Sequence, residues 1–168
     1  MSDKMTVDLK VNGRRYVEMV EPRRLLADFL RHTIGLKGTH IGCEHGVCGV
    51  CTVLVDGQTA RSCLLFAVDV SGCEITTIEG FSHGSELDVV QEAFRQHHAL
   101  QCGFCTPGVL MTVRELLSAN DNPTVDEIKH ALANNLCRCT GYINIVKAVE
   151  TAAAEMRRAK TGAAGVAS

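Results

Sequence analysis

The sequence of 168 residues contains no tryptophan, and aromatic residues make up only 4% of it. It also lacks an excess of charge of either sign, because the formal net charge is -2. Without a basic face, nucleic acid is not an expected partner. No apolar run approaches the roughly 18 residues that a membrane span needs. The first twenty residues alternate charged and apolar positions and form no signal-peptide core. We therefore expect a protein of the reducing cytoplasm.

Cysteine is the residue present in unusual number. There are nine cysteines, an odd number that cannot pair completely, and a cytosolic chain should hold few disulfides. Clustered cysteines in such a chain indicate metal ligands. Eight of them fall into two groups of four, one in each half of the chain. Cys73 lies outside both groups, and we expect it to be a small buried apolar residue.

The first half of the chain predicts a small sheet with one helix. The dipeptides Asn12-Gly13 and Asp56-Gly57, each between alternating apolar residues, predict two β-hairpins. Pro22 suits the first turn of a helix, and the apolar positions within 25–30 give that helix its buried face. Residues 74–78 predict one more strand. A sheet curled over a single helix favours the β-grasp fold.

The second half predicts four helices. Apolar residues recur at helical spacing in four stretches, and Thr124 with Glu127 forms a capping box before the third of them. Four helices of this length suggest a small bundle. The predicted fold class is therefore α+β, with a β-grasp domain over 1–80 and a four-helix domain over 81–168. Residues 79–86 are the expected linker, and the tail from Lys160 is expected to be frayed.

The first cysteine group has the spacing Cys43-x4-Cys48-x2-Cys51, and Cys63 follows on a neighbouring element. This spacing matches plant-type [2Fe-2S] sites. Gly42, Gly46 and Gly49 lack a Cβ, so the loop can fold tightly, take positive φ and point its amide N–H groups inward. Inward N–H groups stabilise an anionic cluster. A structural zinc site is the alternative, although zinc sites usually pair one C-x2-C with another.

The second group combines Cys102-x2-Cys105 with Cys137-x-Cys139. Its spacing alone suits zinc or an iron–sulfur cluster equally. A predicted helix follows Cys105, and another follows Cys139. Two helix N-termini would then direct positive dipole ends at one centre, which favours an anionic cluster. A redox dithiol at Cys102 and Cys105 is a further alternative, but it leaves the other two cysteines unexplained.

Three stretches then show a family resemblance: GCEHGVCGVCTV (42–53), QCGFCTPG (101–108) and NLCRCTGY (135–142). Together they resemble the iron–sulfur subunit of molybdenum hydroxylases, the xanthine dehydrogenase and aldehyde oxidase family, over about residues 5–155. The resemblance implies a plant-ferredoxin-like β-grasp domain followed by a four-helix domain. With no flavin or molybdenum domain in its 168 residues, the chain resembles the separate small subunit of bacterial enzymes.

The resemblance also implies roles for individual residues. An outer [2Fe-2S] cluster near the flavin would be bound by Cys43, Cys48, Cys51 and Cys63. An inner [2Fe-2S] cluster near the molybdopterin would be bound by Cys102, Cys105, Cys137 and Cys139. Gln101 and Cys139 would contact the pterin. Phe104 and Pro107 are expected to shield the inner cluster from water.

The implied function is electron transfer within a molybdenum hydroxylase. Single electrons would pass from the molybdopterin site through the two clusters to FAD while a substrate C–H bond is hydroxylated with water. The molybdenum cofactor and FAD would sit on a large and a medium partner subunit, in a dimer of heterotrimers. Among the family's substrates we expect an N-heteroaromatic ring. The rival hypotheses are a free two-cluster ferredoxin and a zinc-binding interaction module.

Overall fold

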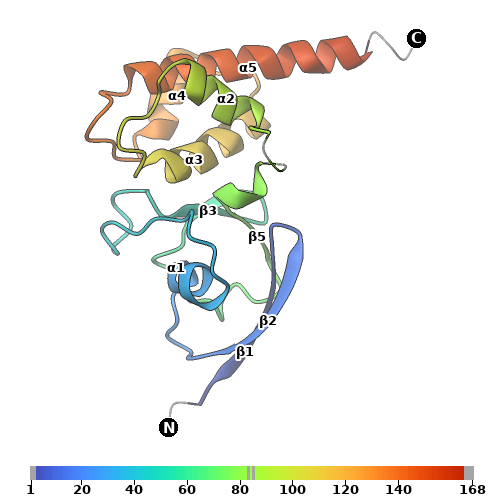
Figure 1. Cartoon of the computed structure of the whole chain (residues 1–168), viewed down its shortest axis with the longest axis vertical. Helices are drawn as coiled ribbons and strands as arrows, with labels where there is room; N and C mark the ends of the chain where they lie inside the picture. The colour runs from blue at the N-terminus through green and yellow to red at the C-terminus, as the bar shows by residue number, and fades with distance from the viewer. Residues whose placement is uncertain (1–2, 83, 85, 165–168) are drawn as a thin grey trace.

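The first half of the chain forms a five-stranded mixed sheet with the order β2-β1-β5-β3-β4 (Figure 1). This computed structural model describes residues 3–82, 84 and 86–164. The predicted hairpins are confirmed, because β1 pairs antiparallel with β2 and β3 with β4, while β5 runs parallel to β1. The strands are β1 (Met5–Val11), β2 (Arg14–Val20), β3 (Thr52–Val55), β4 (Gln58–Arg61) and β5 (Glu74–Thr76).

One short helix packs on this sheet. It consists of α1 (Leu26–Asp28) and the π-helical turn η1 (Phe29–Thr33). Its buried face, which includes Leu26, Phe29 and Leu30, shares a core with the inward residues of the sheet. The prediction that the helix begins at Pro22 is wrong, because Leu25 still has extended backbone angles and the helix starts one residue later. The curled sheet over one helix confirms the β-grasp prediction.

The second half forms the four predicted helices. They are α2 (Val89–Gln96), α3 (Thr106–Ala119), α4 (Val125–Leu132) and α5 (Ile143–Ala164). A short 3-10 turn, η2 (Ile78–Gly80), precedes them within the expected linker, of which residues 83 and 85 lie outside the described residues. The capping box of Thr124 and Glu127 is present. In the described part of the chain, no helix has the length and apolar character that crossing a membrane requires.

The tail differs from its prediction. Helix α5 continues through Lys160 to Ala164, so the first residues of the expected frayed tail are helical. Residues 165–168 lie outside the described residues.

The helical half is stacked on the sheet half (Figure 1). Helix α3 packs against β3 and β4, and its Glu115 accepts hydrogen bonds from the N–H and the hydroxyl of Thr59 on β4, at 2.8 and 2.7 Å. Val50, from the loop that carries the first cysteine group, is 5% exposed and belongs to the helical core. The first cysteine loop is therefore part of the joint between the two halves.

Candidate metal centres

All nine cysteines are free thiols. Cys73 is partly buried against the sheet core, close to its prediction, and burial is the main cause that raises the pKa of its thiol. The other eight form two sets. The N-terminal set is Cys43, Cys48, Cys51 and Cys63, and the C-terminal set is Cys102, Cys105, Cys137 and Cys139.

The N-terminal set is arranged as two pairs of thiols. Cys43 contacts Cys48, and Cys51 contacts Cys63. The pairs are close enough to interact, because a charge on Cys43 raises the pKa of Cys63. Cys63 comes from the turn that follows β4, so the hairpin of β3 and β4 is what brings it back to the loop that carries the other three.

Backbone amides point into the N-terminal set. The N–H of Cys48 donates to the Cys43 sulfur at 3.4 Å, and the N–H groups of His45 and Val47 also favour the thiolate. These amides lower the pKa of Cys43 to about 6. Burial, together with the neighbouring Cys51 thiol, raises the pKa of Cys63 to about 11. The loop thus forms the expected nest of inward N–H groups, which favours negative charge at this site.

The three loop glycines serve different purposes. Gly46 and Gly49 take positive φ, at 83° and 74°, as predicted, and Glu44 takes φ 56° as well. Gly42 has no positive φ, so that part of the prediction is wrong. A Cβ on Gly42 would instead lie 3.2 Å from the Cys48 sulfur, which leaves little space for a side chain there.

The C-terminal set is also two pairs of thiols. The sulfurs of Cys102 and Cys139 are 3.5 Å apart, and Cys105 contacts Cys137. Cys102 and Cys139 are exposed, whereas Cys105 is buried in the helical core. The pair of Cys102 and Cys139 therefore lies at the surface, and the pair of Cys105 and Cys137 is turned toward the interior of the protein.

Helix N-termini and nearby polar groups determine how readily the thiols of the C-terminal set ionise. Helix α3 begins directly after Cys105, as expected, whereas α5 begins only at Ile143, four residues beyond Cys139. Burial raises the pKa of Cys105 to about 12. Burial also opposes ionisation of Cys137, but the Thr140 hydroxyl at 3.1 Å and the Thr140 N–H at 3.5 Å outweigh it and lower the pKa.

The donor set fits a two-iron cluster better than a single ion. Four thiolates bind a [2Fe-2S] cluster, two on each iron, so two neighbouring pairs are the required arrangement. A zinc ion needs its four ligands around one point. Both sets therefore have the number, type and pairing of donors that an iron–sulfur cluster takes.

Three other predicted residues lie near Cys102 and Cys105 in the chain. Gln101 is exposed next to Cys102. Phe104 is 48% exposed, and its shielding of this set stays a prediction. Its ring stacks on His40 at 4.9 Å, and its carbonyl lies 2.8 Å from His40 Nδ1. Phe104 therefore links the two cysteine loops. Pro107 is partly buried.

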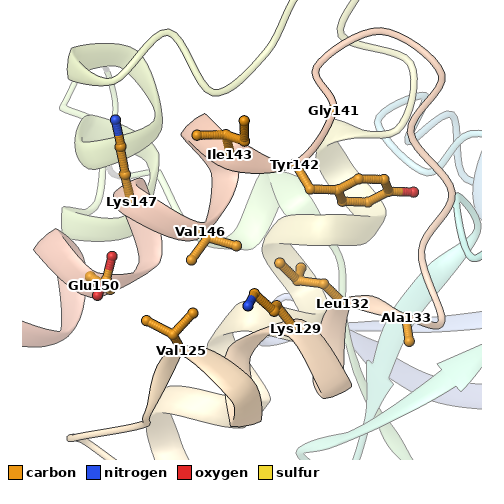
Figure 2. Close-up of a pocket in the computed structure, with 10 residues that line it drawn as sticks. All are labelled: Val125, Lys129, Leu132, Ala133, Gly141, Tyr142, Ile143, Val146, Lys147 and Glu150. Carbon is orange, nitrogen blue, oxygen red and sulfur yellow. The ribbon is translucent and has the colours of Figure 1, made fainter.

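A groove of about 620 Å³ lies between α4 and α5, beside the Gly141–Tyr142 segment (Figure 2). Its lining is mostly apolar but includes Lys129, Lys147 and Glu150, and no cysteine lines it. Ile143 is 66% exposed there. The groove therefore lies outside both cysteine sets.

Sequence reasoning missed the residues that join the two sets. Asn135 is 1% exposed and bonds to the first cysteine loop and to α3. Its position two residues before Cys137, inside the third motif, was the available signal. A buried asparagine cannot be told from an exposed one by spacing alone.

Two family models match the chain, one in each half. Residues 9–77 match a "2Fe-2S iron-sulfur cluster binding domain", and residues 77–150 match a "[2Fe-2S] binding domain". The chain is thus a protein with two [2Fe-2S]-binding domains.

Similar proteins identify the family to which the chain belongs. It is 55% identical over 148 residues to the nicotine 6-hydroxylase small subunit of Paenarthrobacter nicotinovorans, covering 88% of this chain and 89% of the relative. It is 43% identical to the xanthine dehydrogenase iron-sulfur-binding subunit of Escherichia coli O157:H7, covering 88% and 94%. A chain of quinoline 2-oxidoreductase from Pseudomonas putida 86 superposes with TM-score 0.90 at 51% identity, covering 94% and 98%. The chain belongs to the family of iron–sulfur subunits of molybdenum hydroxylases.

Proposed function

We propose that this chain carries single electrons from a molybdenum cofactor on one partner subunit to FAD on another, by way of two [2Fe-2S] clusters. The N-terminal set, Cys43, Cys48, Cys51 and Cys63, is assigned to the outer cluster. The C-terminal set, Cys102, Cys105, Cys137 and Cys139, is assigned to the inner cluster. The chain works as two units, 1–80 and 81–168.

The observation that carries this proposal is that each half holds four thiols as two neighbouring pairs. A bound [2Fe-2S] cluster supplies one-electron redox chemistry. The protein contributes the rest of the site. The N–H groups around Cys43 and the hydroxyl and N–H of Thr140 at Cys137 stabilise negative charge on the sulfurs. Burial of Cys63 and Cys105 keeps water from the inward pairs.

Hydroxylation of a C–H bond with water releases two electrons and two protons for each oxygen atom inserted. A flavin can accept both electrons, but an iron–sulfur cluster takes them one at a time. Two clusters in series allow the electrons to leave the substrate site singly. No residue of this chain is assigned a catalytic role, because the chemistry takes place on the partner.

The exposed pair of the C-terminal set is proposed to face the molybdenum subunit, with Gln101 and Cys139 against the pterin. Exposure of Cys102, Cys139 and Gln101 supports this orientation. The relatives named above as subunits support the existence of partner chains. We extend the interface to the neighbouring apolar groove, beside the exposed Ile143 (Figure 2). The assembly proposed is a dimer of heterotrimers in the cytoplasm.

The proposed substrate is an N-heteroaromatic compound. The names of the relatives refer to nicotine, xanthine and quinoline, and each of these contains a nitrogen heteroaromatic ring. The rival function is a free two-cluster ferredoxin. Electrostatic attraction steers such carriers to their partners and requires a strong net charge. The net charge of this chain is only -2.

The test is to purify the native complex from its host and measure iron, molybdenum and flavin for each copy of this chain. We expect about four irons, with one molybdenum and one FAD, and two larger co-purifying subunits. The same iron on a chain without partners would replace this proposal with the free ferredoxin. Zinc in place of iron would refute both and support the interaction module.

A further inference from the structure

Besides the contact of Phe104 with His40, a short segment, residues 134–136, joins the two cysteine sets. The N–H of Leu136 donates to the carbonyl of Cys48 at 2.9 Å. The side-chain amide of Asn135 donates to the carbonyl of Gly49 at 3.0 Å. Leu136 directly precedes Cys137 of the C-terminal set, while Cys48 belongs to the N-terminal set. Two hydrogen bonds therefore connect the loop of the N-terminal set to the segment that leads into Cys137 of the C-terminal set.

Asn135 connects a third element to this joint. Its Oδ1 accepts a hydrogen bond of 2.8 Å from the hydroxyl of Thr112 on α3, the helix that begins directly after Cys105. Its own carbonyl accepts a bond from the Tyr142 hydroxyl, which in turn accepts one from the N–H of Cys137. Asn135 is 1% exposed, so its amide satisfies both donor and acceptor inside the protein.

Close backbone contacts also prevent the first cysteine loop from shifting relative to the helical half. A Cβ on Gly49 would lie 2.1 Å from the Asn134 carbonyl oxygen, and a Cβ on Gly108 would lie 2.3 Å from the Gly49 carbonyl oxygen. Backbone therefore touches backbone at both positions. Apolar packing alone fixes how closely surfaces approach, but a buried amide with two defined partners also fixes their register.

We propose that Asn135 is a positioning residue that sets the distance and orientation between the two clusters. This inference rests on the proposed function, in which electrons pass between the two cysteine sets. Electron transfer between two centres falls steeply with their separation, so a shift of the loop at Gly49 relative to Cys137 would slow it. The outer loop is held to both parts of the C-terminal set, because α3 follows Cys105 and residue 135 precedes Cys137.

The experiment compares Asn135→Ala with Asn134→Ala in the purified complex. Asn134 is the same residue type one position earlier, and its side chain is exposed. Three quantities are measured: iron for each chain, the thermal midpoint of unfolding, and the magnetic splitting of the EPR signals after full reduction. The splitting reports the separation of the two paramagnetic clusters.

For Asn135→Ala we expect full iron content, with a broadened EPR signal in place of the resolved splitting. Asn134→Ala should match the native protein in both. A lower thermal midpoint with unchanged splitting would mean that Asn135 only stabilises the fold, and would overturn the proposal.

Thr112→Val provides a second test if the alanine variant does not accumulate. It keeps the volume at this position and removes only the hydroxyl that holds Asn135, so partial broadening is expected. Native splitting in this variant would count against the proposal. Absence of iron from the native complex would refute the proposed function itself, and this inference with it.

Discussion

Replacement of Gly49 by alanine is expected to destabilise the protein at the joint between its two halves. Gly49 has φ +74°, a conformation that an alanine adopts only with strain. The new Cβ would lie 2.1 Å from the Asn134 carbonyl oxygen and 3.0 Å from the Asn135 Cα. Both are backbone atoms, so no flexible side chain can move aside to accommodate the methyl group.

The expected loss follows from two contributions. The left-handed conformation costs about 1–2 kcal/mol for an alanine. Overpacking of a close contact costs about 1–3 kcal/mol more. The sum is a loss of about 2–5 kcal/mol in the free energy of unfolding. For a chain of this size each kcal/mol lowers the midpoint by about 2–4 °C, so the thermal midpoint should fall by on the order of 10 °C.

Two matched variants separate the contributions. Gly57 has φ +85° but nothing within 4 Å of its Cβ position, so Gly57→Ala should show only the conformational cost of about 1–2 kcal/mol. Gly108 has no positive φ, but its Cβ would lie 2.3 Å from the Gly49 carbonyl oxygen, so Gly108→Ala should show the steric cost of about 1–3 kcal/mol.

The assay is thermal unfolding of the three variants alongside iron analysis. Gly49→Ala should show the largest fall and lose iron at lower temperature than Gly57→Ala. Equal falls for Gly49→Ala and Gly57→Ala would refute the close approach between the first cysteine loop and residues 134–135.

Three further predictions concern the cysteine sets. Cys139→Ser should remove the inner cluster's EPR signal while the outer signal persists, and Cys73→Ser should keep both; loss of the outer signal first would reverse the assignment. Gln101→Ala should keep full iron but weaken retention of the molybdenum subunit, and loss of iron would argue against a pterin contact. In the metal-free chain at about neutral pH, mass spectrometry should find Cys43 alkylated first and Cys105 last, because their pKa values are about 6 and about 12. Since folding favours the Cys43 thiolate, the stability it contributes is lost as the pH falls through about 6. Equal alkylation rates would show that the N–H groups around Cys43 do not stabilise its thiolate.

Much of the fold follows from local sequence signals. The dipeptides Asn12-Gly13 and Asp56-Gly57 allow positive φ at both turn positions, and the hairpins form there. The capping box of Thr124 and Glu127 begins α4 where it was predicted. These signals succeed because each element depends on neighbours a few residues away.

Local signals were not sufficient where distant contacts decide the outcome. Pro22 is compatible with a first helical turn, yet it lies in a turn closed by the Arg24 N–H and the Glu21 carbonyl. Leu25 is then extended, and the Leu26 N–H donates to the Leu65 carbonyl. Phe104 stacks on His40, sixty-four residues away, a contact that the sequence did not predict. No local pattern contains the information that places either residue.

The sequence by itself determined the elements and the two groups of four cysteines, because turn dipeptides, capping residues and ligand spacing act over short stretches of chain. Only the tertiary structure decided which thiols pair, such as Cys51 with Cys63 and Cys102 with Cys139. It also decided that Asn135 joins the two sets. The physical reason is that these contacts link segments brought together by packing of the whole core, and a buried hydrogen bond exists only once that packing has excluded water.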